Sequence, residues 1–202
     1  MKVVVVTGGI GSGKSVACRM LEKQFGWPVY NADTKVKELY ATSETLLPSI
    51  EKALDINLRN AEGEFVPSLL AGRIFTDPQA LSKVEELVFP ELTSDFEEWK
   101  HKQGSADFVI LESATILEKP QLKGMWDVLI LIDAPIELRR ARAAARDGVS
   151  EEVSAHRMQS QKLMNEVSSG RVIPQADVVI LNDSTESKLQ EKLQNYVVTK
   201  ML

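Results

Sequence analysis

The chain has 202 residues, of which 44% are hydrophobic, and its formal net charge is −5. This length suits one α/β domain with a small insertion, and this share of apolar side chains excludes a disordered chain. The negative balance argues against nucleic acids and membrane surfaces as partners, so an anionic ligand would have to meet a local group of basic residues.

The remaining composition points to an intracellular setting. A single cysteine, Cys18, allows no internal disulfide, which is typical of a reducing cytoplasm. The N-terminal apolar run is too short for a signal peptide, and Val128–Ile132 is far too short to cross a bilayer. His101 and His156 stand without Cys or His at ligand spacing, so no zinc site is expected. The sequence predicts a cytoplasmic protein, either a monomer or a small homo-oligomer.

The first elements form a strand, a glycine-rich loop and a helix. Lys2–Thr7 is a β-branched run, typical of a buried parallel strand, and a helix is expected from about Lys14 to Phe25, closed by Gly26. Between them, Gly8–Ser15 reads GGIGSGKS and fits G-x-x-x-x-G-K-[ST]. Glycines let backbone N–H groups converge on phosphate oxygens, and the helix adds the positive end of its dipole. The pattern predicts a phosphate-binding loop for ATP.

Each part of this loop has an expected role. Lys14 can reach the β- and γ-phosphates, and the Ser15 hydroxyl can ligate a Mg²⁺ ion that arrives with the nucleotide. A chance glycine-rich turn would lack this context, and a dinucleotide site would need G-x-G-x-x-G. The residues expected to contact ATP here are Gly9, Ile10, Gly11, Ser12, Gly13, Lys14, Ser15 and Val16. Neither N-K-x-D nor D-x-x-G occurs, so a switch GTPase is excluded and ATP-dependent kinases or non-catalytic ATP modules remain.

A short second strand at Trp27–Asn31 is followed by Asp33. A carboxylate after a strand of an open α/β sheet lies where such proteins hold ligands, and it can take the proton of an acceptor hydroxyl. Asp33 can equally serve as the N-cap of the next helix, and its position alone leaves both interpretations open.

The stretch at about 33–105 is expected to be a helical insertion that binds the acceptor. A helical segment from Asp33 to about Ala53 is expected to break near Ser43 and Pro48, and a polar turn follows. Asp77-Pro78 predicts a helix start, with Asp as N-cap and Pro in the first turn, and the helix is expected to stop at Pro90 and resume to about Gln103.

Three more apolar strands complete the predicted sheet, and they are Phe108–Glu112, Val128–Asp133 and Val178–Leu181. Strands alternating with helices predict an α/β fold with a five-stranded parallel sheet and helices on both faces. Glu112 ends the third strand, where its carboxylate can order Mg²⁺ through water or merely cap the backbone. Asn182-Asp183 ends the last strand near the expected adenine position, or forms only a turn.

A basic segment lies within this acidic chain. A helix over Pro135–Arg146 places Arg139, Arg142 and Arg146 on one face, where they can neutralise transferring phosphates or form an ordinary solvated surface. A further helix, capped by Ser150, is expected to run to about Ser168. The basic residues of this region suit a lid at about 142–171 that closes over nucleotide.

Together these residues resemble the dephospho-CoA kinase family. The resemblance rests on the Thr7–Ser15 stretch TGGIGSGKS, on Asn31-Ala32-Asp33, on ESATILE at Glu112–Glu118, and on an ordered series of later residues: Arg142, Arg146, Asp147, Arg157, Gln161, Ala176, Asp177 and Asn182. It implies a nucleoside-monophosphate-kinase-like sheet with a helical substrate-binding insertion and a small lid. It also implies transfer of the γ-phosphoryl group of ATP to the ribose 3′-hydroxyl of dephospho-CoA, with ATP, Mg²⁺ and dephospho-CoA as its small-molecule ligands.

The resemblance also implies roles for single residues. Asp33 would be the base, Lys14 and Arg142 would stabilise the transferring phosphoryl group, and Arg146 and Asn182 would contact the nucleotide. The chain departs from the family pattern mainly on the acceptor side, where Phe89 replaces a usual His, Pro67-Ser68 stands near a usual Arg, and Arg139 replaces a frequent Gln. Another P-loop small-molecule kinase, or a nucleotide-binding paralogue with an eroded acceptor site, is the alternative.

Overall fold

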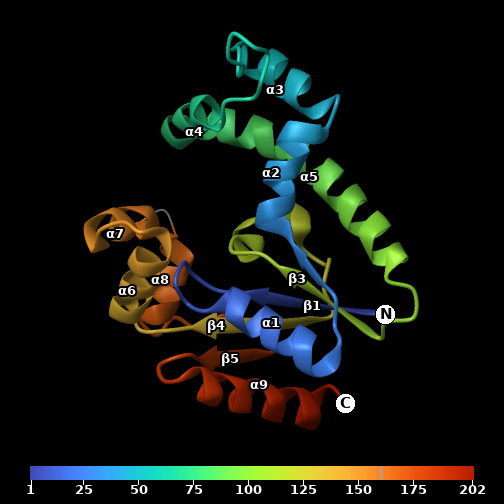
Figure 1. Ribbon diagram of the computed structural model, residues 1–202, viewed down its shortest axis with the longest axis vertical. Helices are drawn as coiled ribbons and strands as arrows, with labels where there is room; N and C mark the ends of the chain where they lie inside the picture. Colours follow the sequence, from blue (N-terminus) through green and yellow to red (C-terminus); the bar gives the residue numbers. More distant parts are fainter. Residues whose placement is uncertain (160) are drawn as a thin grey trace. The chain divides into compact units, whose positions relative to one another are not determined.

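The computed structural model describes residues 1–159 and 161–202, which fold as two compact units (Figure 1). Unit 1 contains Met1–Asn31 and Ser105–Leu202, and unit 2 contains the stretch between them, Ala32–Gly104. The strands of the described residues belong to unit 1, whereas the helices of unit 2 are joined by turns and one isolated bridge between Arg59 and Phe65.

Unit 1 is built on a five-stranded parallel sheet with the order β2-β3-β1-β4-β5. The strands are β1 (Lys2–Thr7), β2 (Val29–Asn31), β3 (Phe108–Glu112), β4 (Val128–Asp133) and β5 (Val178–Leu181). Val4 of the central strand pairs with Ile110 on one side and Val128 on the other. Parallel sheets bury both faces, which explains why these strands read as continuous apolar runs. The predicted five-stranded α/β architecture is confirmed.

Helices follow the strands of unit 1 and cover the sheet. They are α1 (Lys14–Phe25), α6 (Ile136–Asp147), α7 (Glu151–Gln159), α8 (Lys162–Ser168) and α9 (Glu186–Lys200), with two 3₁₀ turns at Ile116–Glu118 and Pro120–Leu122. Leu21 of α1 and Leu193 of α9 pack with Val4 in one core cluster. Val5 points to the opposite face of the sheet and is fully buried as well.

The parallel arrangement brings the ends of the strands together at one edge. Asn31 pairs with Glu112 in the register of β2 and β3, and Glu112 pairs with Val6 of β1. The glycine loop after Thr7 starts from the same edge, because the carboxyl ends of parallel strands coincide. The glycine loop, Asn31 and Glu112 therefore lie at the same edge of the sheet.

The segment after α6 differs from its prediction. A single helix was expected from Ser150 to about Ser168, but α7 ends at Gln159 and α8 starts at Lys162. Position 160 of the expected helix lies outside the described residues. Gln161 caps α8 with non-helical dihedrals, φ −93° and ψ 62°, and its side chain accepts a hydrogen bond from Ile10. A contact with a distant loop thus outweighs the local helical preference of this segment.

Unit 2 consists of α2 (Ala32–Thr42), α3 (Leu46–Leu54), α4 (Pro67–Thr76) and α5 (Pro78–Lys102) around a core of its own. Leu46, Ile50 and Val84 belong to its buried apolar cluster. Asp77 caps α5 as predicted, since its carboxylate accepts hydrogen bonds from the backbone N–H groups of Gln79 at 2.9 Å and Ala80 at 3.2 Å.

Three expectations for unit 2 were wrong or incomplete. Pro90 was expected to interrupt α5, but the helix passes through it, because buried residues such as Val88 and Leu92 on either side continue one packed face. Pro48 lies in the first turn of α3, where a proline removes no intrahelical hydrogen bond, so the break falls before it. Helix α4 was missed: it has only ten residues, Gly72 in its interior weakens the local helical preference, and Leu70 is its one buried apolar side chain.

Candidate active site

The glycine loop is shaped for close approach by a ligand and by its own neighbours. Gly11 and Gly13 have φ values of +76° and +102°, in the left-handed region that favours glycine. A Cβ on Gly11 would lie 2.0 Å from the backbone oxygen of Arg139, and a Cβ on Gly13 would lie 2.3 Å from Nδ2 of Asn182. The loop thus packs tightly against α6 and the residue after β5. Its pattern of glycines is required by contact as well as by backbone conformation.

The loop is also tied to its surroundings by hydrogen bonds. Asn182 donates through Nδ2 to the Ser12 carbonyl at 2.8 Å, and the Asn182 carbonyl accepts from Nη1 of Arg142 at 2.9 Å. The buried hydroxyls of Thr7 and Ser12 have no hydrogen-bond partner among the described residues. Buried hydroxyls are normally satisfied, so these two fit a loop whose polar groups are completed by a bound anion or its water.

Helix α1 begins directly at the end of this loop. Its N-cap is Gly13, which offers no side-chain cap, and no acidic residue lies in its first turn. The first N–H groups of a helix have no intrahelical acceptors and carry the positive end of the dipole. This arrangement fits the phosphates of a nucleotide, and Lys14, the first residue of α1, adds a positive charge at the same place.

A hydroxyl and a carboxylate meet beside the loop. The Ser15 hydroxyl donates to Oε1 of Glu112 at 2.6 Å, and Nδ2 of Asn31 donates to Oε2 of the same carboxylate at 2.9 Å. Glu112 is 5% exposed, whereas Ser15 is exposed. No group of three or more potential metal ligands occurs within residues 1–159 and 161–202. The Ser15 hydroxyl and the Glu112 carboxylate are oxygen ligands of the kind that Mg²⁺ prefers, and they fit an ion that arrives with nucleotide phosphates.

The three arginines of α6 have three different environments. Arg139 is fully buried, and its Nε donates to the Ile10 carbonyl at 3.0 Å. Arg142 is half-buried and bonded to Asn182. Arg146 is exposed and pairs with Asp147, which Arg157 also contacts at 2.9 Å. Arg146 and Arg157 hold the pKa of the Asp147 carboxyl below its usual range. Helical spacing predicted a shared face, but it could not show that the arginine nearest the loop is enclosed.

Asp177, one of the residues in the resemblance, lies away from the loop. Its carboxylate accepts a hydrogen bond from the Leu129 N–H at 2.7 Å, just before β5 begins. Asp127 does the same for Val3 at the start of β4, at 2.7 Å. Both carboxylates therefore satisfy backbone groups at the amino ends of strands, which is a structural role.

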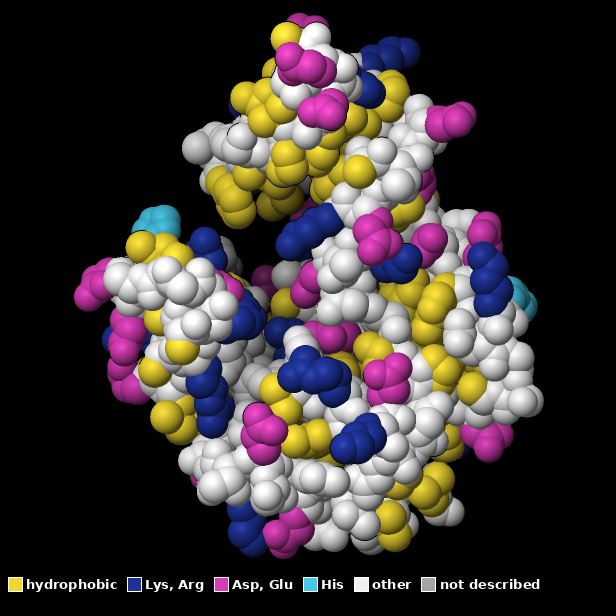
Figure 2. Space-filling view, viewed as in Figure 1, with side chains coloured by type: hydrophobic (Ala, Val, Ile, Leu, Met, Phe, Trp, Pro, Cys, Tyr) yellow, Lys and Arg dark blue, Asp and Glu magenta, His cyan; other side chains and the backbone are white. Residues whose placement is uncertain are grey.

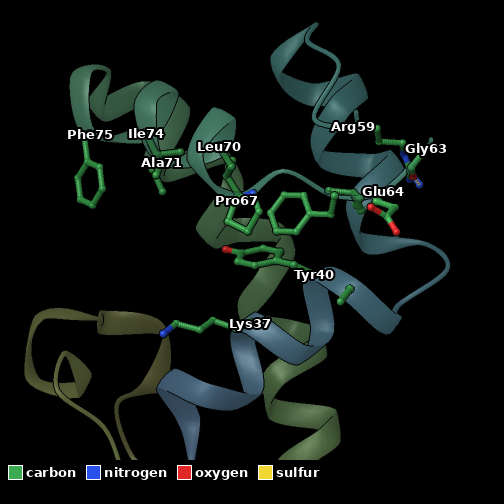
Figure 3. A pocket seen from close by; sticks show the side chains of 13 residues that line it. Lys37, Tyr40, Arg59, Gly63, Glu64, Pro67, Leu70, Ala71, Ile74 and Phe75 are labelled. Carbon is green, nitrogen blue, oxygen red and sulfur yellow. Dashed lines mark hydrogen bonds between the residues drawn. The ribbon is translucent and has the colours of Figure 1, made fainter. Parts of the chain in front are cut away.

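Unit 2 carries Asp33 and a large pocket. Asp33 is an exposed residue in the first turn of α2, and α2 begins directly after Asn31. The pocket has a volume of about 700 Å³ and lies within unit 2 (Figure 3). Its lining residues are Lys37, Tyr40, Ala41, Leu47, Arg59, Gly63, Glu64, Phe65, Pro67, Leu70, Ala71, Ile74 and Phe75.

The pocket of unit 2 has an apolar wall and a few polar groups. The rings of Tyr40 and Phe65 lie 5.5 Å apart between centroids. Figure 3 shows residues of α4 above the ring of Tyr40 and the Lys37 ammonium to one side. Phe75 is 79% exposed, and hydrophobic side chains gather over this part of unit 2 (Figure 2). Burial, aided by the charge of Glu85, raises the pKa of Tyr40 to about 12. Sequence analysis missed the pocket, because α4, the helix that forms one of its walls, was not predicted.

Among the described residues, no helix combines the length and the apolar character that a membrane span requires.

Known proteins are similar to this chain over most of its length. A family model described as dephospho-CoA kinase matches residues 2–188. A dephospho-CoA kinase of Porphyromonas gingivalis is 36% identical over 162 residues, which cover 80% of this chain and 78% of that protein. One from Bacteroides fragilis is 33% identical over 193 residues, covering 94% of this chain and 88% of that protein.

Solved structures have the same fold. TT1252 from Thermus thermophilus superposes with a TM-score of 0.82 at 26% identity, covering 100% of this chain and 98% of that one. A dephospho-CoA kinase from Campylobacter jejuni gives a TM-score of 0.59 at 21% identity over 97% of this chain and 95% of that one. With a matching model over most of its length and relatives above 30% identity, this chain belongs to the dephospho-CoA kinase family.

Proposed function

We propose that the protein transfers the γ-phosphoryl group of ATP to the ribose 3′-hydroxyl of dephospho-CoA, giving coenzyme A and ADP. The observation that carries this proposal is the glycine loop with the Ser15–Glu112 pair beside it, in a chain of this family. An ATP-dependent kinase needs a rigid cradle for the terminal phosphates and a hydroxyl–carboxylate pair near the metal ion.

The ATP phosphates would lie on the loop. The N–H groups of the loop residues Gly9 to Val16 and the Lys14 ammonium are the expected phosphate contacts, with Lys14 reaching the β- and γ-phosphates. The Ile10 N–H is the exception, because it already donates to Oε1 of Gln161 at 2.7 Å. Ser15 would hold Mg²⁺ directly and Glu112 would hold it through water. The ion would supply charge neutralisation at the β- and γ-phosphate oxygens. Asn182 at the end of β5 is proposed for the adenine side, and Arg146 for the phosphates when the lid closes.

The chemical step exchanges one P–O bond for another. The 3′-oxygen of the acceptor forms a bond to the γ-phosphorus, while the bond from that phosphorus to the β–γ bridging oxygen breaks and its electrons leave with ADP. Asp33 would accept the proton of the 3′-hydroxyl. Lys14 and Arg142 would stabilise the charge on the transferring group. Arg142 suits this role because its bond to Asn182 ties it to the residue that also supports Ser12.

The helical region at about 33–105 is proposed to bind the acceptor, and the segment at about 142–171 to serve as lid. Dephospho-CoA carries a long pantetheine arm with methyl groups and amides, and the pocket of unit 2 offers an apolar wall with a few polar groups for such an arm. Pro67, which departs from the family pattern, lines this pocket, whereas Phe89 is buried with 9% exposure. Lys37 and Arg59 are then the cationic groups of the pocket for an anionic acceptor.

We also propose that the enzyme works in the cytoplasm, as a monomer or a small homo-oligomer. The single cysteine supports a reducing compartment, since the chain uses no disulfide for stability.

The test is an acceptor screen with the purified protein, ATP and Mg²⁺, following ADP release. Dephospho-CoA is expected to support turnover and to yield a product with the mass of coenzyme A, whereas shikimate, gluconate and adenosine are not. Turnover with one of those acceptors instead would indicate a different small-molecule kinase. Calorimetric binding of ATP without turnover of any acceptor would indicate a nucleotide-binding paralogue.

A further inference from the structure

One residue of the phosphate loop is held on both of its backbone polar groups by side chains from outside the loop. The Ile10 carbonyl accepts from Nε of Arg139 at 3.0 Å, and the Ile10 N–H donates to Oε1 of Gln161 at 2.7 Å. Arg139 lies on α6 and Gln161 directly before α8, so both partners come from far along the chain. Two segments that are distant in the sequence therefore hold the loop at Ile10, in addition to β1 and α1, which flank it.

The Arg139 guanidinium continues this contact into α8. Its Nη1 donates to the Met164 carbonyl at 3.1 Å and to the Ser168 hydroxyl at 2.9 Å, while Nη2 lies 3.5 Å from Oε1 of Gln161. Ser168 in turn donates to Oδ1 of Asp133 at 2.6 Å. The Arg139 guanidinium thus contacts the loop through Nε, and it contacts the first and last turns of α8 through Nη1.

The fit around this group is tight. A Cβ on Gly9 would lie 1.9 Å from Nη2 of Arg139. The arginine is fully buried, and this burial lowers its pKa while the charge of Asp133 opposes the shift. A buried guanidinium is costly unless every donor is used, and it keeps its charge at any ordinary pH. Its four hydrogen bonds therefore have to be kept together, which makes the position of α8 and the shape of the loop depend on each other.

We propose that Arg139 is a positioning residue that couples the conformation of the phosphate loop to the placement of α8. It does not contact the nucleotide but acts through Ile10. Binding of nucleotide phosphates, which fixes the loop, then stabilises Lys162–Ser168, and an ordered α8 in turn raises the affinity of the loop for nucleotide. Such reciprocity is required by thermodynamics whenever the state of one site changes the equilibrium at another. The proposal rests on the proposed function only in that the loop binds nucleotide.

The test compares Arg139→Met and Arg139→Lys with the wild-type protein in two measurements, ADP affinity by calorimetry and backbone hydrogen exchange with and without ADP. In the wild type, ADP is expected to slow exchange in the loop and throughout α8. In Arg139→Met, ADP affinity should fall at least tenfold, and the ADP-dependent protection of α8 should disappear while that of the loop remains. Arg139→Lys keeps the charge but lacks the planar fork, so it should lose the coupling as well.

Two further variants separate positioning from general destabilisation. Leu193→Ala removes a fully buried side chain of α9 and should lower stability while leaving ADP affinity within twofold and the α8 response intact. Gln161→Leu removes the acceptor that the Ile10 N–H and Nη2 of Arg139 share, and should weaken both ADP binding and the α8 response. It replaces Arg139→Met if that variant does not fold.

The proposal would be overturned if ADP protected α8 equally in the wild type and in the Arg139 or Gln161 variants. It would also be overturned if these variants bound ADP with an affinity within twofold of the wild type. Loss of the α8 response in Leu193→Ala would also overturn it, because general destabilisation would then suffice. None of these measurements uses an acceptor, so they stand even if the acceptor of the reaction is not dephospho-CoA.

Discussion

Replacing Gly11 by alanine tests whether the shape of the phosphate loop depends on its contact with α6. The matched control is Gly26→Ala, because Gly26 has a φ of +71° and Gly11 one of +76°, so both substitutions impose the same backbone strain. That strain amounts to about 1–2 kcal/mol for a single left-handed alanine. The two sites differ in space: no atom lies within 4 Å of a Cβ at Gly26, whereas a Cβ at Gly11 would lie 2.0 Å from the Arg139 carbonyl oxygen.

The size of the effect follows from that contact. The carbonyl belongs to α6 and cannot rotate away, so the loop must move about 1.4 Å, the difference between 2.0 Å and an ordinary contact of 3.4 Å. This movement breaks the 3.0 Å bond from Arg139 to Ile10. A hydrogen bond from a charged group contributes about 1.5–3 kcal/mol, so Gly11→Ala should cost about 2.5–5 kcal/mol in total against about 1–2 for Gly26→Ala.

The assays are thermal unfolding and ADP calorimetry on both variants. A chain of this size loses about 2–4 °C of its midpoint per kcal/mol, so the additional cost of about 1.5–3 kcal/mol should lower the midpoint of Gly11→Ala by about 3–12 °C more than that of Gly26→Ala. ADP affinity should fall at least tenfold in Gly11→Ala and stay within twofold in Gly26→Ala, which lies at the far end of α1. Equal midpoints, or undiminished ADP affinity in a folded Gly11→Ala, would show that the shape of the loop does not depend on its contact with α6.

Four further outcomes are expected. Lys14→Ala should abolish turnover, while Lys23→Ala, in the last turn of the same helix, should leave it unchanged in the ADP-release assay. Asp33→Asn should lower turnover by about 10²–10⁴-fold with ADP affinity kept, and near-normal turnover would exclude Asp33 as the base. Burial, together with a neighbouring carboxylate, raises the pKa of the Cys18 thiol well above its usual range, so a thiol reagent at pH 8 should label the protein only after unfolding. Because the pKa of Tyr40 is raised to about 12, its contribution to stability is full below about pH 10, the pKa of free tyrosine, and is lost as pH rises through about 12. Ultraviolet titration should show a phenol ionising near 12 that is absent from Tyr40→Phe.

Local signals predicted unit 1 closely. The bounds of β1, α1, β3, β4 and β5 agree with the sequence, because apolar runs and left-handed glycines such as Gly26 act over a few residues. Unit 2 was predicted less well, since packing of apolar residues on both sides of Pro90 outweighed its local cost. Helix α4 presents most of its apolar side chains to a pocket or to solvent, and Gly72 in its interior weakens the local helical preference.

The candidate site shows the same division. The loop and the Ser15–Glu112 pair were predictable, because a strand, a glycine motif and a parallel register bring them together. The burial of Arg139 was not, because it depends on α8 returning to the loop more than twenty residues later. Helical spacing shows which side chains share a face but not which distant segment covers it.

The most direct measurement of the central claim is ³¹P NMR of a reaction containing ATP, Mg²⁺, dephospho-CoA and the enzyme. We expect the γ-phosphate signal of ATP to decay while a ribose 3′-phosphomonoester appears in equal amount, and we expect neither change with Lys14→Ala. Decay of the γ-phosphate signal to inorganic phosphate alone, or phosphomonoester formation by Lys14→Ala at the wild-type rate, would contradict the proposed phosphoryl transfer on this loop.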